Sequence, residues 1–289
     1  MKIAVLGSLE SWYVKDLQRA ATNRHTISPI TFSDLRSTLT SGPMAASSGD
    51  IDLRDADAVL VRTMPPGSLE QVVMRMDVLG QLAAAGTLVM NPPRSIEVAV
   101  DKYLATARLS AAGLAVPRTI VCQTSDDAMA AFSELGGDAV LKPIFGAEGR
   151  GITRLTDEAL ALRAFKMLEQ LGAVIYLQQF IEHEGCDLRL LVIGEQVLGM
   201  RRCNPDDWRT NVSLGARTSP LEVSSELESL ARTAAAAVGA PFSGVDLLPG
   251  RDGNLYAIEV NAVPGWKALA RTLDTDIAQR VLDYLESAR

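Results

Sequence analysis

The chain is poor in the residues that most transition-metal and nucleophilic chemistry requires. Its 289 residues include two histidines and three cysteines, Cys122, Cys186 and Cys203, with no C-x-x-C pair. We therefore expect no histidine-rich metal site, no thiolate zinc site and no histidine-based triad. An odd number of cysteines argues against a disulfide framework and favours reduced thiols and a cytoplasmic location. Any metal should be a hard cation held by oxygen atoms.

Long apolar runs and excess positive charge are also missing. No apolar run approaches the roughly 18 residues of a membrane span, and the run at the N-terminus is too short for a secretion signal. Lys and Arg number 28 against 35 Asp and Glu, which gives a net charge of −7. We therefore expect neither nucleic acid nor a membrane as a partner. With 47% hydrophobic residues, the chain can bury a core, and its length favours two or three subdomains.

The apolar pattern of the first part predicts alternating strands and helices. Strands are expected over residues 2–6, 56–61 and 87–90, with helices near 11–21 and 68–85. This small α/β unit has a glycine turn at Gly7 but no G-x-G-x-x-G, so a dinucleotide site is not expected. Residues 37–50 are rich in Ser, Thr and Gly and predict a long surface loop.

A second set of elements follows the break at Asn91-Pro92-Pro93. Helices are expected from residue 95 and over 125–135 and 157–171, and strands over 118–122, 139–142 and 173–180. The remaining sequence predicts two hairpins, a helix over 224–238 and a last helix from about residue 274. The second part is therefore a mixture of helices and strands, like the first.

A glycine-rich loop is the first candidate for chemistry. Lys142 ends a predicted strand and is followed by Gly146, Gly149 and Gly151. Glycine lets backbone N–H groups approach anionic oxygens closely, and the lysine can reach a phosphate. No Gly-Lys-Ser/Thr follows, so the loop is not a Walker A motif. A hairpin turn that only needs positive φ would look the same, and both interpretations stay open.

An acidic hairpin near the end of the chain is the second candidate. If Asp252-Gly253 is a two-residue turn, Asp246 lies directly opposite Glu259, and Asn261 projects from the same face. Three oxygen ligands on one patch suit a divalent cation, which would relieve the repulsion between opposed acids. A four-residue loop keeps this arrangement, whereas a five-residue loop puts the acids on opposite faces. An edge hairpin with solvated acids is the alternative.

A set of charged residues on and after the strand at 187–193 is the third candidate. Asp187 and Arg189 alternate onto one face, and a turn after residue 193 would bring Arg202 to Asp187 as a cross-strand ion pair. Beyond them, Arg209 and Asn211 extend a local group of cations in an acidic chain. Such a group suits phosphates or carboxylates, although a solvated loop would look similar.

Together these segments resemble the ATP-grasp superfamily, specifically its RimK-like branch of glutamate ligases. The segments that carry the resemblance are Asp101-Lys102, Val140 to Gly151, Tyr176 to Ile181, Asp187 to Arg189, Trp208 to Asn211, Gly244 to Asp246 and Glu259 to Gly265. The resemblance implies an α/β and α+β chain with an ATP-grasp fold, in which two α+β subdomains clasp ATP behind a small Rossmann-like α/β domain. We expect the Rossmann-like domain at 1–94, the central subdomain at 95–178 and the C-terminal subdomain at 179–289.

The resemblance also implies roles for individual residues. ATP would be bound by Lys102, Lys142, Gly146, Gly149 and Gly151, with Gln178, Gln179 and Phe180 along the adenine and Asp187 at the ribose. Mg²⁺, or Mn²⁺ in its place, would be bound by Asp246, Glu259 and Asn261, and the candidate catalytic residues are Arg209, Asn211 and Arg189. The sequence departs from the family at Gln179, where glutamate is frequent, and at Ser213 to Ala216, which lacks the usual basic residue and second glycine.

The implied activity is that of an ATP-dependent carboxylate–amine ligase that forms an amide through an acyl phosphate. It would add L-glutamate to a carboxylate acceptor such as a pterin or deazaflavin coenzyme, with residues 146–151 closing as a lid that excludes water. The alternatives are a ligase for a polypeptide C-terminus, a ligase for an amino-carrier protein of lysine biosynthesis, and a non-catalytic ATP sensor. The expected partners are small molecules, and the resemblance implies a homo-oligomer.

Overall fold

The N-terminal part of the chain folds around a parallel sheet. A computed structural model describes residues 1–42, 44–146 and 149–289, and in it four strands pair in the order β2-β1-β6-β7. The elements are β1 Lys2–Leu6, α1 Trp12–Ala21, β2 Thr26–Ile30, β6 Ala58–Val61, α2 Leu69–Ala84, β7 Leu88–Met90 and α3 Pro93–Val100. Residues 3–6 are buried throughout, which is typical of a parallel strand covered on both faces. This sheet is the Rossmann-like region that the sequence predicted.

Residues 37–50 do not form the long surface loop that their composition predicted. Residues 37–38 and 45–48 belong to a small antiparallel sheet with β3 Leu35–Thr38, β4 Ala45–Ser48 and β5 Ile51–Asp52, followed by a 3-10 turn at Leu53–Asp55. Leu35, Ala46 and Leu53 are buried in the main core. Packing of these side chains outweighs the loop-like composition of the segment.

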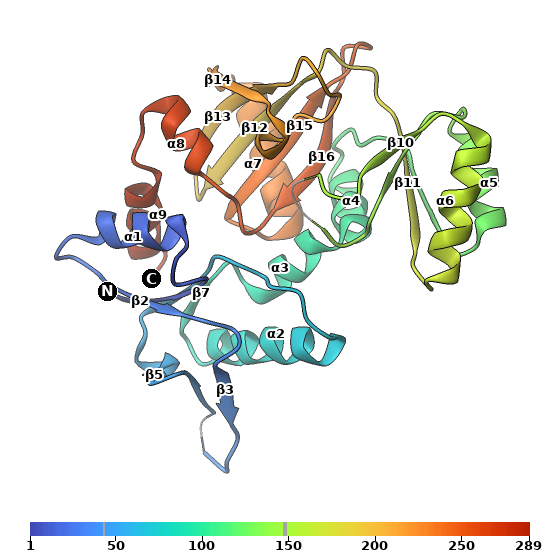
Figure 1. Cartoon of the computed structure of the whole chain (residues 1–289). Coiled ribbons are helices and arrows are strands. Elements are labelled where there is room, and N and C mark those ends of the chain that lie inside the picture. The colour runs from blue at the N-terminus through green and yellow to red at the C-terminus, as the bar shows by residue number, and fades with distance from the viewer. Residues whose placement is uncertain (43, 147–148) are drawn as a thin grey trace.

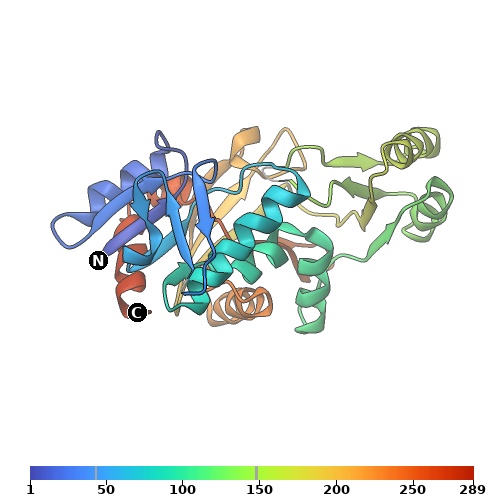
Figure 2. The same ribbon diagram turned by 90° about the horizontal axis from the view of Figure 1, so that it is seen from below.

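The central part carries its own sheet and its own core. Its strands pair antiparallel in the order β10-β9-β11-β8, and α5 and α6 pack on one face. The elements are β8 Thr119–Cys122, α5 Ser125–Glu134, β9 Ala139–Lys142, β10 Thr153–Leu155, α6 Glu158–Gln170 and β11 Ile175–Gln179. Figure 2 shows this part projecting from the rest of the molecule. The buried residues of its cluster all lie within residues 128–177, whereas the other two clusters each combine N-terminal and C-terminal residues. Motion of this lobe as a unit is therefore the default expectation.

A five-stranded antiparallel sheet forms the C-terminal part, with strand order β14-β13-β12-β15-β16 (Figure 1). The elements are β12 Cys186–Ile193, β13 Gln196–Cys203, a 3-10 turn at Val212–Leu214, β14 Arg217–Leu221, α7 Ser225–Val238, β15 Phe242–Pro249, β16 Leu255–Asn261, α8 Lys267–Leu273 and α9 Ile277–Ser287. Helix α4, Lys102–Ala111, packs against β16 and α7. Among the described residues, no helix is both long and apolar enough to cross a membrane.

The N-terminal part and the C-terminal sheet share one continuous core. Leu6 of β1 and Val59 of β6 belong to the same buried cluster as Leu190 of β12 and Val245 of β15. Helix α9 packs against α1, and the two chain ends lie side by side in both views (Figures 1 and 2). Asp276 caps this helix, which explains why it begins at residue 277 and not near 274. The two parts therefore form a single body, against which the central lobe is set.

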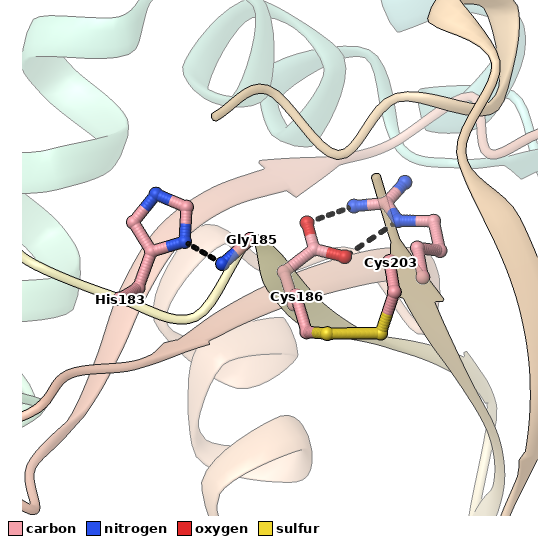
Figure 3. The surroundings of a disulfide bond; sticks show 6 residues. His183, Gly185, Cys186 and Cys203 are labelled. Carbon is pink, nitrogen blue, oxygen red and sulfur yellow. Dashed lines mark hydrogen bonds and ion pairs between the residues drawn. A yellow bond between two sulfur atoms is a disulfide. The ribbon is translucent and has the colours of Figure 1, made fainter. Parts of the chain in front are cut away.

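Cys186 and Cys203 form a disulfide across β12 and β13, which corrects the expectation of free thiols (Figure 3). The two residues are directly paired in the ladder, with their Cα atoms 4.1 Å apart. Cys122 is the free cysteine. An odd cysteine count says nothing about which two strands will be neighbours, so the pairing could not be found by counting.

Candidate functional site

Two acids face each other across the β15–β16 ladder. Asp246 pairs with Glu259, as the hairpin analysis predicted, and Gly244 pairs with Asn261. The two-residue turn from which this was derived is wrong, because the loop spans residues 250–254. The ladder shifts by one residue between Asp246 and Leu247. This β-bulge restores the facing that a five-residue loop alone would have lost.

Arg189 lies in the same row of the sheet as the two acids. It pairs with Asp246 across β12 and β15, and its Nε is 3.1 Å from Oδ1 of that residue. Gly244 leaves room for the guanidinium, since a Cβ on this glycine would collide with Nη1 of Arg189. The row therefore runs from a cation through Asp246 to Glu259, on one face of the sheet.

Asp187 and Arg202 form the cross-strand ion pair that the alternation allowed. Nε and Nη2 of Arg202 donate to Oδ1 and Oδ2 of Asp187 at 2.8 and 2.5 Å, and both side chains are buried. Nη2 of Arg202 also lies 3.0 Å from Oδ2 of Asp246. Removing one partner of such a buried pair typically costs about 3–5 kcal/mol, because the other charge is left alone. Both oxygens of Asp187 are thus engaged by an arginine, at the residue expected to meet a ribose.

The donor set on the acidic ladder fits a hard divalent cation. Oδ1 of Asp246 is buried and accepts no hydrogen bond, with Nε of Arg189 as its ion-pair partner, and Glu259 is half-buried opposite it. Oδ1 of Asn261 accepts a hydrogen bond from the backbone N–H of Val263 at 2.8 Å. Outside residues 43 and 147–148, no three acidic, histidine or cysteine side chains gather as a metal group. An ion here would rest on two carboxylates and an amide oxygen, which suits Mg²⁺.

Two half-buried lysines face Glu259. Nζ of Lys102 donates to the carbonyl of Gly146 at 2.7 Å, and Nζ of Lys142 donates to Oε1 of Gln178 at 2.5 Å. Both lysines and Glu259 line one small cavity of about 10 Å³. Burial lowers the pKa of Lys142 to about 8 and also lowers the pKa of Lys102, while Glu259 opposes both shifts. Side chains from α4, β9 and β16 thus form a compact charged group.

The glycine-rich loop meets the loop that follows β13. Gly149 has a φ of 72°, and a Cβ there would lie 2.6 Å from Oδ1 of Asn211. Arg209 is held by Asp207, whose Oδ2 accepts from Nη2 at 2.6 Å. Gly146 and Gly151 also have positive φ, and the expected lid residues 147 and 148 lie outside the described residues. The two loops therefore lie close together at Gly149 and Asn211.

A cavity of about 530 Å³ opens where the central lobe joins the C-terminal sheet. Its lining includes Arg154, Phe180, His183, Trp208 and Arg251. The guanidinium carbon of Arg154 lies 3.4 Å from the centre of the Phe180 ring, and the rings of Phe180 and Trp208 are 5.7 Å apart. The lining also contains four acids, Glu182, Glu184, Asp206 and Asp207. The volume is within the range of ligand pockets, and it is the aromatic rings, with Arg154 stacked on Phe180, that suit a flat base.

The residues expected along the adenine are only partly brought together. Phe180 lines the 530 Å³ cavity, Gln178 is buried against Lys142, and Gln179 is exposed. Arg154 and His183 were missed by the sequence analysis. Arg154 could have been found from strand pairing, because it pairs with a residue two positions before Lys142. No pattern in the sequence indicated the position of His183.

Comparisons with known proteins show what the chain is similar to. A family model described as a RimK-like ATP-grasp domain matches residues 99–285. The chain is 34% identical to the tetrahydromethanopterin:alpha-L-glutamate ligase of Methanosarcina acetivorans, over 83% of this chain and 82% of the relative. It is 32% identical to a probable alpha-L-glutamate ligase of Mannheimia succiniciproducens, over 81% and 78%. The ATP-grasp ligase PsnB, solved with a phosphomimetic variant of its minimal precursor, Mg and ADP, superposes with a TM-score of 0.77 at 25% identity, covering 99% of this chain and 97% of PsnB.

We predict that ATP binding is accompanied by proton uptake at Lys142. Because burial lowers the pKa of this ammonium to about 8, part of the population is neutral near that pH, and a bound phosphate would restore the charged form. Calorimetric titration at that pH, in buffers of different ionisation enthalpy, should show uptake of roughly half a proton.

The exposed Lys166 on α6 provides the control for this measurement. Lys142→Met should remove the proton uptake, and Lys166→Met should keep it. In the ligand-free protein, the unfolded chain holds the Lys142 proton more tightly between the lowered pKa, about 8, and the ordinary value of 10.5. The free energy of unfolding should therefore rise with pH through that window, and this rise should be smaller in Lys142→Met. Uptake that persists in Lys142→Met would contradict the assignment.

Proposed function

This chain belongs to the RimK-like ATP-grasp family, and from that premise we propose that it joins L-glutamate to a carboxylate acceptor at the expense of ATP. The family resemblance, the ATP-grasp fold and an ATP-dependent ligase activity, all expected from the sequence, are confirmed by the relatives. The observation that carries the proposal is the meeting of Lys102, Lys142 and Glu259 in one cavity between the central lobe and the C-terminal sheet. Phosphoryl transfer requires cations that stabilise the charge on the phosphate oxygens and carboxylates that hold the metal ion.

The proposed reaction has two steps. A carboxylate oxygen of the acceptor attacks the γ-phosphorus of ATP, ADP leaves, and an acyl phosphate forms. The amine of glutamate then attacks the acyl carbon, the amide forms, and phosphate and a proton are released. We assign the stabilisation of the tetrahedral oxyanion to Arg209 and Asn211, with Arg189 of β12 as a third candidate. This route needs no protein nucleophile, in keeping with a chain that has only two histidines.

ATP and Mg²⁺ are the usual ligands of this family, and their contacts here are part of the proposal. Asp246, Glu259 and Asn261 would hold Mg²⁺, or Mn²⁺ in its place, and the ion would neutralise phosphate charge. Lys102 and Lys142 would contact the phosphates, together with Gly146, Gly149 and Gly151. The base would lie along Phe180, in the 530 Å³ cavity. The other residues proposed to contact the nucleotide are Gln178 and Gln179 at the end of β11 and Asp187 on β12.

The acceptor is proposed to be a small coenzyme of pterin or deazaflavin type. The Methanosarcina relative, whose name specifies tetrahydromethanopterin, supports this choice. A polypeptide acceptor is the second candidate, favoured by the likeness to PsnB, which was solved with a precursor. We also keep a homo-oligomer and a cytoplasmic location as proposals, although the location was inferred partly from free thiols and Cys186 and Cys203 are bonded.

We also propose the division into domains at 1–94, 95–178 and 179–289. The parallel sheet lies within the first range and the sheet of β12 to β16 within the third, while the sheet of β8 to β11 lies in the second except for Gln179, the last residue of β11. The buried clusters do not follow these bounds throughout, because Ile96, Ala105 and Leu109 of the second range belong to a cluster with residues of the first and third ranges. Only the cluster within residues 128–177 lies wholly in the second range. The three domains should therefore behave as two bodies.

The first test is a screen for glutamate-dependent ADP formation. Purified protein with ATP, Mg²⁺, L-glutamate and a metabolite extract should form ADP and make one component heavier by a glutamyl residue. Glu259→Gln should lower kcat by about 100-fold or more through loss of the metal ligand, while Glu169→Gln, an exposed acid on α6, should have no effect. A mass gain on a protein would select the polypeptide acceptor, and full activity of Glu259→Gln would refute the metal assignment.

The closing of the glycine-rich loop gives a second test. Gly149→Ala should lower kcat by about 10-fold, because the new Cβ strains a positive φ and meets Asn211, which keeps the loop from closing. Gly172→Ala is the matched control, with a φ of 65° and no atom within 4 Å of its Cβ. Equal losses in the two variants would assign the effect to backbone strain and would contradict a lid that closes on Asn211.

A further inference from the structure

Two buried side chains of the N-terminal part hold the turn that follows β16, the strand that carries Glu259 and Asn261. Arg62 follows β6 and Asn91 follows β7, so both leave the carboxyl edge of the parallel sheet. Nη2 of Arg62 donates to the carbonyl of Pro264 at 2.6 Å, and Nδ2 of Asn91 donates to the carbonyl of Ala262 at 2.6 Å. In open α/β sheets this edge commonly faces a ligand. Here, residues from two neighbouring strands bind the backbone of residues 262–264.

Asn91 ties both strands of the acidic ladder together. Its Nδ2 also donates to the carbonyl of Phe242 at 2.5 Å, and its Oδ1 accepts from the N–H of Phe242 at 3.1 Å. Phe242 begins β15, which carries Asp246, and Ala262 directly follows β16, which carries Glu259. The Asn91 side chain is 1% exposed. One carboxamide therefore fixes the relative position of the two strand ends from outside the sheet.

Arg62 is buried in a box of aromatic rings. Its guanidinium carbon lies 4.3 Å from the ring centre of Trp266, 5.0 Å from that of Tyr13 and 5.5 Å from that of Phe242. Nε and Nη1 have no hydrogen-bond partner, so π faces take the place of water around this cation. Burial lowers the pKa of Arg62 to about 9. A cation is expensive to bury, and the Pro264 carbonyl is the polar group to which it is bonded.

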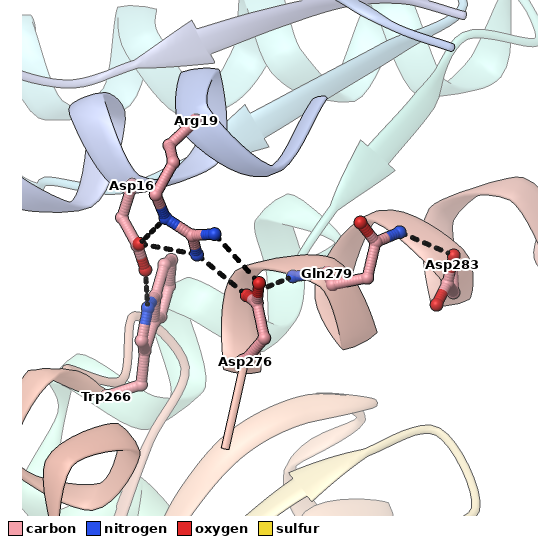
Figure 4. Close-up of polar contacts among 6 residues, drawn as sticks. All are labelled: Asp16, Arg19, Trp266, Asp276, Gln279 and Asp283. Carbon is pink, nitrogen blue, oxygen red and sulfur yellow. Dashed lines mark hydrogen bonds and ion pairs between the residues drawn. The ribbon is translucent and has the colours of Figure 1, made fainter. Parts of the chain in front are cut away.

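The same turn is fixed at its far end by α1. Nε1 of Trp266 donates to Oδ2 of Asp16 at 2.9 Å, and Arg19 joins Asp16 to Asp276 at the start of α9 (Figure 4). A Cβ on Gly265 would lie 2.5 Å from the hydroxyl of Tyr13. Residues 262 to 266 are therefore held by side chains of β6, β7 and α1, and a small displacement of the turn would meet one of them.

We propose that Arg62 and Asn91 are positioning residues for the divalent cation. Oδ1 of Asn261 is bonded to the N–H of Val263, so the orientation of its amide depends on the turn that these residues hold. Glu259 lies two residues earlier on the same strand and moves with it. This inference rests on the proposed function, because it takes Glu259 and Asn261 as ligands of the ion. It assigns to the N-terminal part a role in metal affinity without any contact with metal or substrate.

Mg²⁺ affinity can be measured without turnover. The thermal shift caused by a non-hydrolysable ATP analogue is recorded against Mg²⁺ concentration, and again in EDTA. Arg62→Met should raise the half-saturating Mg²⁺ concentration about tenfold, the usual effect of losing a group that orients metal ligands. The shift in EDTA should stay as in the wild type, because the nucleotide contacts are elsewhere. An unchanged Mg²⁺ requirement in Arg62→Met would overturn the proposal.

Arg75 offers a matched control in the same part of the chain. It is 8% exposed, its Nη1 donates to the carbonyl of Pro65 at 2.8 Å, and its guanidinium carbon lies 5.5 Å from the centre of the Phe32 ring. Arg75→Met therefore removes the same chemistry from a place that does not touch the turn. It should lower the melting temperature and leave the Mg²⁺ requirement unchanged. An equal rise in both variants would reduce the Arg62 effect to general destabilisation and sink the proposal.

The turn can also be displaced from the other side, which keeps the test open if Arg62→Met does not fold. Gly265→Ala would push against the hydroxyl of Tyr13 and should raise the Mg²⁺ requirement. The next ring atom of Tyr13 is 3.4 Å from the added Cβ, so Tyr13→Phe should relieve the contact. The double variant should regain the Mg²⁺ requirement of Tyr13→Phe alone. If Gly265→Ala has no effect, or the double variant does not recover, the turn does not position the metal ligands.

Glu259→Ala separates failure of this inference from failure of the proposed function. If Glu259→Ala leaves the Mg²⁺ titration unchanged, the metal assignment itself is wrong, and Arg62 and Asn91 have no metal ligand to position. If Glu259→Ala removes the Mg²⁺ dependence while Arg62→Met behaves as the wild type, only the positioning role fails. The proposal is supported if Glu259→Ala raises the Mg²⁺ requirement or removes the Mg²⁺ dependence, Arg62→Met raises the requirement, and Arg75→Met leaves it unchanged.

Discussion

Two carboxylates held opposite each other on the β15–β16 ladder are the constraint on which the cleft depends. Opposed like charges destabilise a sheet unless cations surround them. Asp246 meets Arg189 and Arg202 on its own sheet, while Glu259 faces two lysines that come from α4 and β9. Electrostatics therefore draws the central lobe toward the C-terminal sheet. A divalent ion would neutralise part of this charge and bring the phosphates to the same place.

The distribution of the core decides which surfaces can move around that charge. The N-terminal part shares buried clusters with the C-terminal sheet, whereas the central lobe has a cluster of its own. Lys142 and the glycine-rich loop belong to the central lobe, and the acids belong to the larger body. Opening the cleft would thus separate Lys142 from the carboxylates, while Lys102 on α4 would stay with them, and neither core would be disturbed. Contacts such as that between Gly149 and Asn211 are the ones such a motion would make and break.

Local periodicity was enough to predict most elements and the facing of Asp246 and Glu259. It succeeded at the acids although the turn was wrong, because a bulge that no sequence period reveals corrected the register. Alternation also placed Asp187 and Arg202 on adjacent strands, but it could not choose between an ion pair and a ribose contact. The strands within 37–50 and the Cys186–Cys203 bond depend on packing and pairing with other segments. Residue composition does not indicate which segments will be neighbours.

The contacts of Arg62 and Asn91 show why contacts between residues far apart in the sequence could not be predicted. Each lies after a predictable strand, yet its partner is a backbone carbonyl 202 or 171 positions away along the chain. Every residue has a backbone carbonyl, so no sequence motif can identify the one that will accept the hydrogen bond. The buried charge is the signal that remains: an arginine directly after an apolar strand must find an acceptor or aromatic faces once the sheet is covered. In this fold the required acceptor is the turn after β16. If Glu259 and Asn261 bind the ion as proposed, folding of the N-terminal sheet is a condition for an ordered metal site.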